Sequence, residues 1–340
     1  MFLEVKKKIT STLLILSIFF TFPIYSTTVS YPSISIASIK KEFGRSITAF
    51  LSDRGFPGAI VSIYQGGQEL INECFGICED TDKAYPLASV SKLFTEAAVN
   101  QLIENDVVTR DTKVLEYLEI NFPVKDSRVK QITVGQLLDH TGGWDREITE
   151  DPLFAFDRLP KSINSNEDLL KFVLKTYRLD HQPGTYESYS NFGYFLLGQV
   201  IEKATGQKYL DYLNDKFAHP NHIELYQAKT PQAYSEEYPY DNFFKLELAT
   251  STFGLAAKMS DIGYFFSKFD RHGFETASPK FMSDWWKDGS LPGMVTSLVR
   301  KRDNDVAVVV FIPTRDEENW MEDNTILTEL VDMTANHLGL

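Results

Sequence analysis

Apolar residues recur at helical spacing near the start of the chain and then change to an alternating pattern. Residues 35–53 predict an amphipathic helix, because their apolar positions fall near one helical face: Ile36, Ile39, Phe43, Ile47 and Phe50. Residues 59–64 and 69–74 read instead as two short strands. The intervening Gln65-Gly66-Gly67 is typical of a tight turn, so we expect the two strands to form a hairpin.

Helical signals dominate the middle of the chain. A helix is expected from Ser89 to about Glu104, with one buried face. Three further helices are expected: one after the capping box of Thr133 and Gln136, one from Ser165 to about Tyr177, and one over the apolar run Phe192–Ile201, ended by Gly206. Residues 207–250 carry no pattern that assigns them to an element.

The end of the chain returns to strands. We expect a helix at 260–269, strands at 294–299 and 306–312 around a turn at 302–305, and a closing helix at 319–338. Strands at both ends with helices between them predict an α+β fold, in which one antiparallel sheet is built from both chain ends and flanked by helices. Residues 31–340 would form one domain, with a sheet part at about 31–84 and 250–340 and a mainly helical insertion at about 85–249.

Residues 1–30 differ from the rest of the chain. Lys6, Lys7 and Lys8 precede an apolar run at 13–22, and Pro23 and small residues follow it, as in a secretory signal peptide. The run is about half of the ~20 residues needed to cross a bilayer, so no stable membrane span is expected. The segment predicts export to the periplasm or the exterior; left uncleaved, it would be an N-terminal membrane anchor. The cleavage position stays open.

Composition narrows the possible partners. The formal net charge is −13, and loss of residues 1–30 would make it more negative, since they carry three lysines and one glutamate. Such a protein repels nucleic acid, so the expected partner is a small-molecule or peptide substrate. The oligomeric state stays open.

The two cysteines, Cys74 and Cys78, can pair in an oxidising compartment only if the chain turns at Gly76. In a straight strand they would lie too far apart for a disulfide. Both outcomes therefore stay open.

No metal or organic cofactor is expected. His219 and His222 are residue types that bind metals, but Pro220 breaks the helix that would align them. No glycine-rich phosphate loop occurs. Three carboxylates that could be taken for an acid pair are interpreted as solvated loop charges: Asp139, Asp145 and Glu147.

A candidate nucleophile lies at the start of the 89–104 helix. In Ser89-Val90-Ser91-Lys92, helical spacing places Lys92 beside the Ser89 hydroxyl. A serine is a weak nucleophile until a neighbouring base activates it, and the lysine can do so. The N–H groups at the helix start help to hold the lysine's proton off and favour a developing oxyanion.

A second segment with matching chemistry is Tyr189-Ser190-Asn191, on the loop that enters the Phe192 helix. A phenol hydrogen-bonded to a lysine can serve as a general base or acid. The Asn191 amide can orient a substrate carbonyl.

The third segment is Lys287-Asp288-Gly289-Ser290. Lys287 brings a second cation, and Gly289 allows close approach of the backbone to a substrate. If the segment is an edge strand, the N–H of Ser290 can join the N–H of Ser89 in an oxyanion hole.

Together these segments resemble the serine β-lactamase, penicillin-binding protein and esterase superfamily, and within it the class C β-lactamase-like serine hydrolases. The likeness runs from about residue 56 to 311. It is carried by ASVSKLF at 88–94, ITVGQLLDHTGGWD at 132–145, QPGTYESYSNFGYFLLGQVIEKATG at 182–206 and DWWKDGSLPG at 284–293. The resemblance implies the same architecture, with the active site in the groove between the sheet part and the helical part. It also implies that the segment around His140 is kept for structural reasons near the site.

The resemblance also implies residue roles. Ser89 would be the acylated nucleophile, Lys92 its proton partner and Tyr189 the general base. Lys287 would polarise Tyr189 or bind substrate, and Ser290 would complete the oxyanion hole. The expected substrate-binding residues are Asn191, Lys287, Asp288, Gly289 and Ser290.

The predicted function is a secreted serine hydrolase that cleaves an ester or amide through an acyl-enzyme on Ser89. Two alternatives stay open: a D-Ala-type peptidase or β-lactamase acting on cell-wall peptides or their mimics, and a slowly acylating penicillin-binding-like sensor or binding module. One departure bears on the substrate. Asp288 stands where relatives usually have threonine, which predicts poor activity on substrates that present a carboxylate there. The alternative is that strand alternation turns Asp288 away from Lys287 and out of the site, where it would not affect the substrate.

Overall fold

The computed structural model describes residues 36–334, apart from 78–79, 150, 154–158, 229–245, 272, 274–284, 291–295, 303–304 and 314–327. The expected signal peptide, Cys78 and the outer parts of the closing helix lie outside the described residues. The chain from Ile36 onward folds as one unit. Within the described part, no helix is both long enough and apolar enough to cross a membrane.

A five-stranded antiparallel sheet joins the two ends of the described chain, as predicted. Its strand order is β2-β1-β8-β7-β6. The strands are β1 Gly58–Gln65, β2 Gln68–Gly76, β6 Trp285–Ser290, β7 Thr296–Arg302 and β8 Val306–Ile312. The expected hairpin is formed by β1 and β2, and β8 pairs with β1. The Lys287 segment is β6, at the edge of the sheet.

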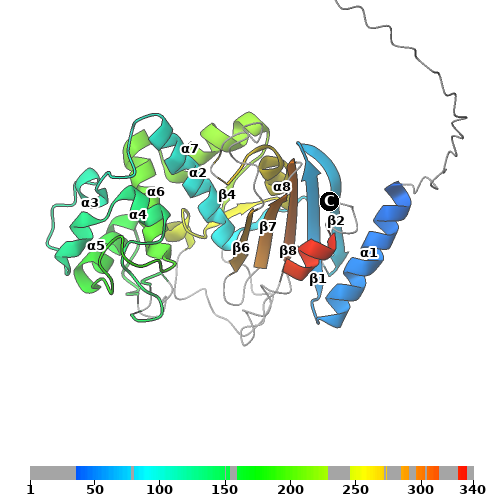
Figure 1. Cartoon of the computed structure of the whole chain (residues 1–340), viewed down its shortest axis with the longest axis horizontal. Coiled ribbons are helices and arrows are strands. Elements are labelled where there is room, and N and C mark those ends of the chain that lie inside the picture. The colour runs from blue at the N-terminus through cyan, green and yellow to red at the C-terminus, as the bar shows by residue number, and fades with distance from the viewer. Residues whose placement is uncertain are drawn as a thin grey trace, which may run out of the picture. The chain divides into compact units, whose positions relative to one another are not determined.

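Helix α1, Ile36–Asp53, and a helix at 328–334 cover one face of this sheet (Figure 1). Successive side chains of β8 point to opposite faces of the sheet, so these two helices cover only every second one. Val306, Val308 and Val310 pack with α1, whereas Ala307 and Val309 belong to the larger core on the opposite face. A fully buried valine stabilises the fold by roughly 1.5–3 kcal/mol, so the strand is held from both sides.

The opposite face packs against α8, Met259–Lys268, whose Phe265 and Phe266 are buried. The helical part adds α2 Ser91–Glu104, α3 Val114–Tyr117, α4 Val134–Leu138, α5 Asn166–Thr176, α6 Asn191–Thr205 and α7 Tyr209–Leu213. A small sheet has the order β3-β5-β4, formed by Tyr85–Pro86, Leu255–Ala257 and Tyr226–Gln227.

The predicted helix ends are confirmed where side-chain chemistry defines them. The Thr133 hydroxyl accepts from the Gln136 N–H, and the Gln136 side chain accepts from the Thr133 N–H, which is a complete capping box. Ser165 caps α5, and Gly206 ends α6 with φ 70°. Helix α8 begins one residue earlier than expected, at Met259.

The hairpin ends in a turn at Gly76, where φ is 69°. A Cβ at this position would lie 2.5 Å from the Pro57 carbonyl oxygen, so the turn requires glycine. Cys74, just before the turn, is disulfide-bonded.

The loop between α3 and α4 contains a half-buried ion pair, Asp126 with Arg128, and both side chains bind the backbone of Leu179 in the 177–182 loop. The Asp126 carboxylate, in a residue 7% exposed, accepts hydrogen bonds from the Arg128 side chain and from the N–H groups of Arg128 and Leu179. The Arg128 hydrogen bond lowers the pKa of Asp126 to about 2.

We expect Asp126→Asn to destabilise the fold at neutral pH and to flatten its acid sensitivity. A lowered carboxyl pKa stabilises the native state above the unfolded value near 4, and this contribution is lost as the pH falls toward 2. The shift corresponds to about 2 kcal/mol. Urea unfolding at pH 7, 4 and 2 checks this: the parent should lose more stability than the variant between pH 4 and 2. Parallel losses would contradict it.

Candidate active site

Ser89 lies in a single 3₁₀ turn, Ala88–Val90, directly before α2. Ala88 has φ 47°, a left-handed conformation that a non-glycine residue rarely adopts. The turn is held by the Leu87 N–H bonded to the Leu255 carbonyl, at 2.8 Å, and by Ser297 Oγ donating to the Leu87 carbonyl, at 3.1 Å. The N-cap of α2 is Val90 and no side chain caps it, so the Ser89 hydroxyl does not serve as a helix cap.

Lys92 is buried, with 1% of its surface exposed, although it carries an amine. Its Nζ lies 3.2 Å from Ser89 Oγ, 2.8 Å from Asn191 Oδ1 and 2.9 Å from the Thr252 carbonyl oxygen. The predicted Ser89–Lys92 contact is therefore present. The Asn191 contact joins the first and second predicted segments.

The surroundings of Lys92 favour its neutral form. Burial lowers the pKa of Lys92 well below its ordinary value, and the charge of Lys287 lowers it further; Asp151 and Asp288 act in the opposite direction. A neutral amine has two N–H donors and one lone pair. When the donors face Asn191 Oδ1 and the Thr252 carbonyl, the lone pair is left for the Ser89 hydroxyl.

Tyr189 completes the contact with the nucleophile. Its hydroxyl donates to Ser89 Oγ at 2.8 Å, and the centroid of its ring lies 4.8 Å from Lys92 Nζ. Burial raises the pKa of Tyr189 above its ordinary value, so the phenol keeps its proton at neutral pH. The arrangement brings together all three residues expected to be catalytic: Ser89, Lys92 and Tyr189.

His140 supports the Tyr189 loop. Its Nδ1 accepts from the Ser190 N–H at 3.1 Å, and its carbonyl accepts from the Ser188 N–H at 2.9 Å. Its ring centroid lies 4.6 Å from that of Tyr189. Burial lowers the pKa of His140 to about 3, so the ring is neutral and Nδ1 can accept.

Asn191 and Thr252 are hydrogen-bonded to each other, and each is hydrogen-bonded to Lys92. Asn191 Nδ2 donates to the Leu153 carbonyl at 3.3 Å, so its Oδ1 is the atom that faces Lys92. Thr252 Oγ1 donates to the Asn191 carbonyl at 3.1 Å. Sequence reasoning missed Thr252, because a backbone carbonyl leaves no signal in residue type.

The third segment, β6, lies against Tyr189 and the turn that carries Ser89. Lys287 Nζ lies 4.9 Å from the Tyr189 ring centroid, and burial lowers the pKa of Lys287. Gly289 packs against the nucleophile turn so closely that a Cβ would lie 2.4 Å from the Leu87 carbonyl oxygen and 2.8 Å from the Ser89 nitrogen. Ser290 is the last residue of this edge strand, and its place in an oxyanion hole stays a prediction.

Asp288 alternates with Lys287 and Gly289 along β6, so its Cβ points to the other side of the strand. Its charge nevertheless raises the pKa of both lysines, Lys92 and Lys287. A contact between Asp288 and a substrate stays a prediction.

The model of the Beta-lactamase family matches residues 43–266. The chain belongs to the beta-lactamase family. It is 34% identical over 189 residues to the probable fimbrial assembly protein FimD, serogroup H1, of Dichelobacter nodosus, a match covering 52% of this chain and 46% of that protein. It is 29% identical over 189 residues to penicillin-binding protein 4 of Amycolatopsis lactamdurans, covering 54% and 47%. The chain thus spans about half the length of these curated relatives.

Solved structures of beta-lactamase relatives share the fold. The D-amino acid amidase from Ochrobactrum anthropi SV3 has a TM-score of 0.67 at 18% identity, covering 88% of this chain and 98% of that one. A class C beta lactamase has a TM-score of 0.66 at 15% identity, covering 89% and 99%. The predicted β-lactamase/DD-peptidase-like fold and the predicted family are both confirmed.

The prediction of solvated loop charges was wrong for one of the three carboxylates. Asp145 is not a solvated charge: it is 3% exposed and accepts from His181 Nε2 at 2.7 Å and from Ser188 Oγ at 3.1 Å. The His181 contact lowers the pKa of Asp145. The sequence could not show that this loop folds onto the segment before Tyr189. Asp139 and Glu147 are exposed, as expected.

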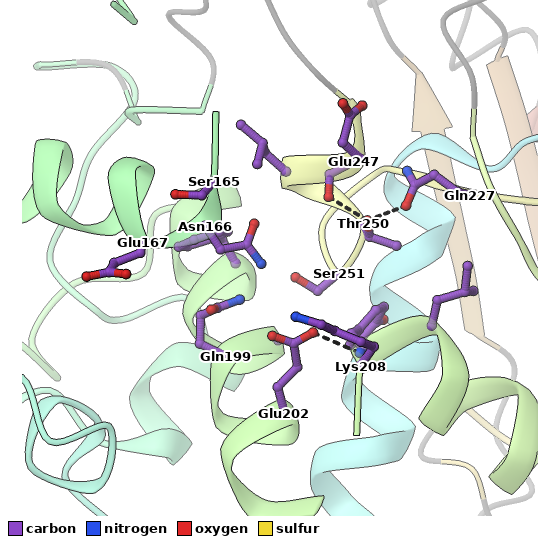
Figure 2. A pocket seen from close by; sticks show the side chains of 15 residues that line it. Ser165, Asn166, Glu167, Gln199, Glu202, Lys208, Gln227, Glu247, Thr250 and Ser251 are labelled. Carbon is purple, nitrogen blue, oxygen red and sulfur yellow. Dashed lines mark hydrogen bonds between the residues drawn. The ribbon is translucent and has the colours of Figure 1, made fainter. Parts of the chain in front are cut away.

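A separate cavity of about 560 Å³ lies between α5, α6 and the 247–251 segment. Figure 2 shows the polar side chains around it, among them Gln199, Glu202, Lys208 and Glu247. None of the residues expected to be catalytic lines it. No group of three or more metal-binding side chains occurs among the residues with described positions, which include His219 and His222.

We expect Gly289→Ala to impair the active site more than the fold. The added methyl would force β6 away from the Ser89 turn, and a displacement of ~1 Å can cost ~10²-fold in rate. The second-order rate of labelling by a fluorophosphonate measures this. Gly44→Ala, where a Cβ would lie 3.4 Å from the Phe75 ring, is the matched control and should label at the parent rate. Equal rates in both variants would contradict the prediction.

Proposed function

We propose that this beta-lactamase-family chain hydrolyses an amide or ester through an acyl-enzyme at Ser89. The observation that carries the proposal is the position of Ser89 Oγ between the Lys92 amine and the Tyr189 phenol. A serine in contact with both a base and an acid is the arrangement that acyl transfer requires. Export through residues 1–30 is part of the same proposal and is supported by the sequence pattern alone.

In the first step, neutral Lys92 takes the proton of Ser89 and Oγ forms a bond to the substrate carbonyl carbon. The N–H groups of Ser89 and Ser290 stabilise the resulting oxyanion. Tyr189 gives its proton to the leaving group as the carbonyl–leaving group bond breaks, and Lys92 returns a proton to the phenol. Water then attacks the acyl-enzyme by the reverse transfers. The raised pKa of Tyr189 keeps the phenol protonated, so it is not available as the first base, and we assign that role to Lys92.

Likeness and charge support a proposal about the substrate class. Related folds include a D-amino acid amidase and a beta-lactamase/D-alanine carboxypeptidase. We propose that this chain acts on small neutral amides or esters, since the acidic chain and Asp288 disfavour a carboxylate near β6.

We expect Ser89→Ala to abolish covalent labelling by a fluorophosphonate while leaving thermal unfolding unchanged. Ser52→Ala, on an exposed position of α1, is the matched control and should label fully. Mass spectrometry locates the label. A label on another residue would refute the nucleophile assignment, and a label on Ser89 in the parent that persists without turnover of any ester or amide would indicate a binding module instead.

We expect Asp288→Thr to raise activity on nitrocefin, which carries a carboxylate, relative to a short p-nitrophenyl ester. Two like charges ~4 Å apart at an effective dielectric of about 20 repel by about 4 kcal/mol. The Cβ of Asp288 points to the other side of β6 from Lys287, so the repulsion that the substitution removes is smaller than this. The measurement is the ratio of kcat/KM for the two substrates, with Asp211→Thr on α7 as an exposed control. An unchanged ratio would remove Asp288 from substrate selection.

A further inference from the structure

A buried carboxylate that no catalytic motif contains lies behind the Tyr189-Ser190-Asn191 turn. Asp151 is 0% exposed. Its Oδ2 accepts a short hydrogen bond from Ser190 Oγ, and its two oxygens each lie 3.2 Å from the Phe192 nitrogen. Oδ1 also accepts from the Leu153 N–H at 3.0 Å. One side chain thus binds the middle of the turn and the first residues of α6.

The same contacts set the direction of the Asn191 amide. Leu153, whose N–H is held by Asp151, offers its carbonyl to Asn191 Nδ2. This leaves Asn191 Oδ1 for Lys92 at 2.8 Å. A reversed amide would place an NH₂ group against the amine, which cannot accept from it while its lone pair faces Ser89. Asp151 therefore acts on Lys92 through Leu153 and Asn191.

Asp151 also acts on Lys92 through charge. Burial raises the pKa of Asp151 to about 6, while its hydrogen bonds and Lys92 oppose this, so it is ionised at pH 7 and above. The charges that act on Lys92 are Lys287, which lowers its pKa, and Asp151 and Asp288, which raise it. The groups in contact with the amine are neutral: Ser89, Asn191, the Thr252 carbonyl and the rings of Tyr189, Tyr194 and Phe253.

We infer that Asp151 is a positioning residue for the Ser89 reaction: it holds the Tyr189-Ser190-Asn191 turn in register with Lys92 and supplies a buried negative charge that acts on that amine. The inference about rate rests on the proposed function, whereas the inference about the turn does not. Asp151 touches no reacting atom. Its effect is carried by the residues it binds.

The test is Asp151→Asn, which keeps the size of the side chain and removes its charge. We measure kcat and KM for a p-nitrophenyl ester from pH 5 to 9, per site labelled by fluorophosphonate. We expect kcat to fall by ~10²-fold with little change in KM, since a misplaced catalytic group has this cost. We also expect the acid limb of kcat/KM to move to lower pH, because loss of the anion lowers the pKa at which Lys92 becomes neutral.

Asp126→Asn is the matched control, the same substitution at a buried carboxylate that also binds backbone N–H groups. It should leave the acid limb and kcat per labelled site unchanged. A parent-like kcat and acid limb in Asp151→Asn would overturn the inference while leaving the Ser89 assignment intact.

Hydrogen exchange gives a readout independent of activity. In Asp151→Asn we expect the amides of Phe192 and Gly193 to lose more protection than core amides elsewhere in the chain, whereas in Asp126→Asn they should lose no more than those amides do. If Ser89 proves not to be the nucleophile, hydrogen exchange still decides the positioning role, and unchanged protection overturns it.

If Asp151→Asn does not fold, Ser190→Ala is the second variant, because it keeps the carboxylate of Asp151 and removes one of its hydrogen bonds. It should lower kcat, and an unchanged kcat would overturn the inference.

Discussion

The architecture of the site depends on keeping one amine out of water. Lys92 is almost fully buried, and burying a charge without partners is costly. The protein meets this constraint with hydrogen-bond partners from three separate parts of the chain: the turn before α2, the start of α6 and the segment before β5. The same burial that demands these partners lowers the pKa of the amine. The burial that brings these segments together around Lys92 therefore also favours the neutral amine, the form that can act as a base.

Much of this could be predicted from the sequence. The helix caps at Thr133 and Ser165, the hairpin before Gly76 and the strand at 306–312 follow local rules of spacing and turn chemistry, and the structure contains all of them. The three motif segments were predicted to meet, and Ser89, Tyr189 and Lys287 do lie together.

The remainder depends on contacts that residue type does not encode. Thr252 contributes a carbonyl, which every residue possesses. Asp145 and Asp151 lie in an acidic loop whose charges look solvated until the loop folds onto the Tyr189 segment. Their burial is a property of long-range packing, and neither helical nor strand periodicity reports it. The supporting residues of an active site are therefore harder to predict than the residues that perform its chemistry.

The pairing of β1 with β8 has a consequence for the order of events during synthesis. These strands, at 58–65 and 306–312, are separated by most of the chain, and β6 must also arrive before Gly289 can close against the nucleophile turn. Sequence-distant pairings of this kind fold slowly, since loop-closure entropy is lost before the contacts form. A nascent chain that has emerged only as far as α8 already contains Ser89, Lys92 and Tyr189 but lacks the strands that complete the sheet. The candidate active site can therefore be assembled only after the chain has been made at least as far as β8.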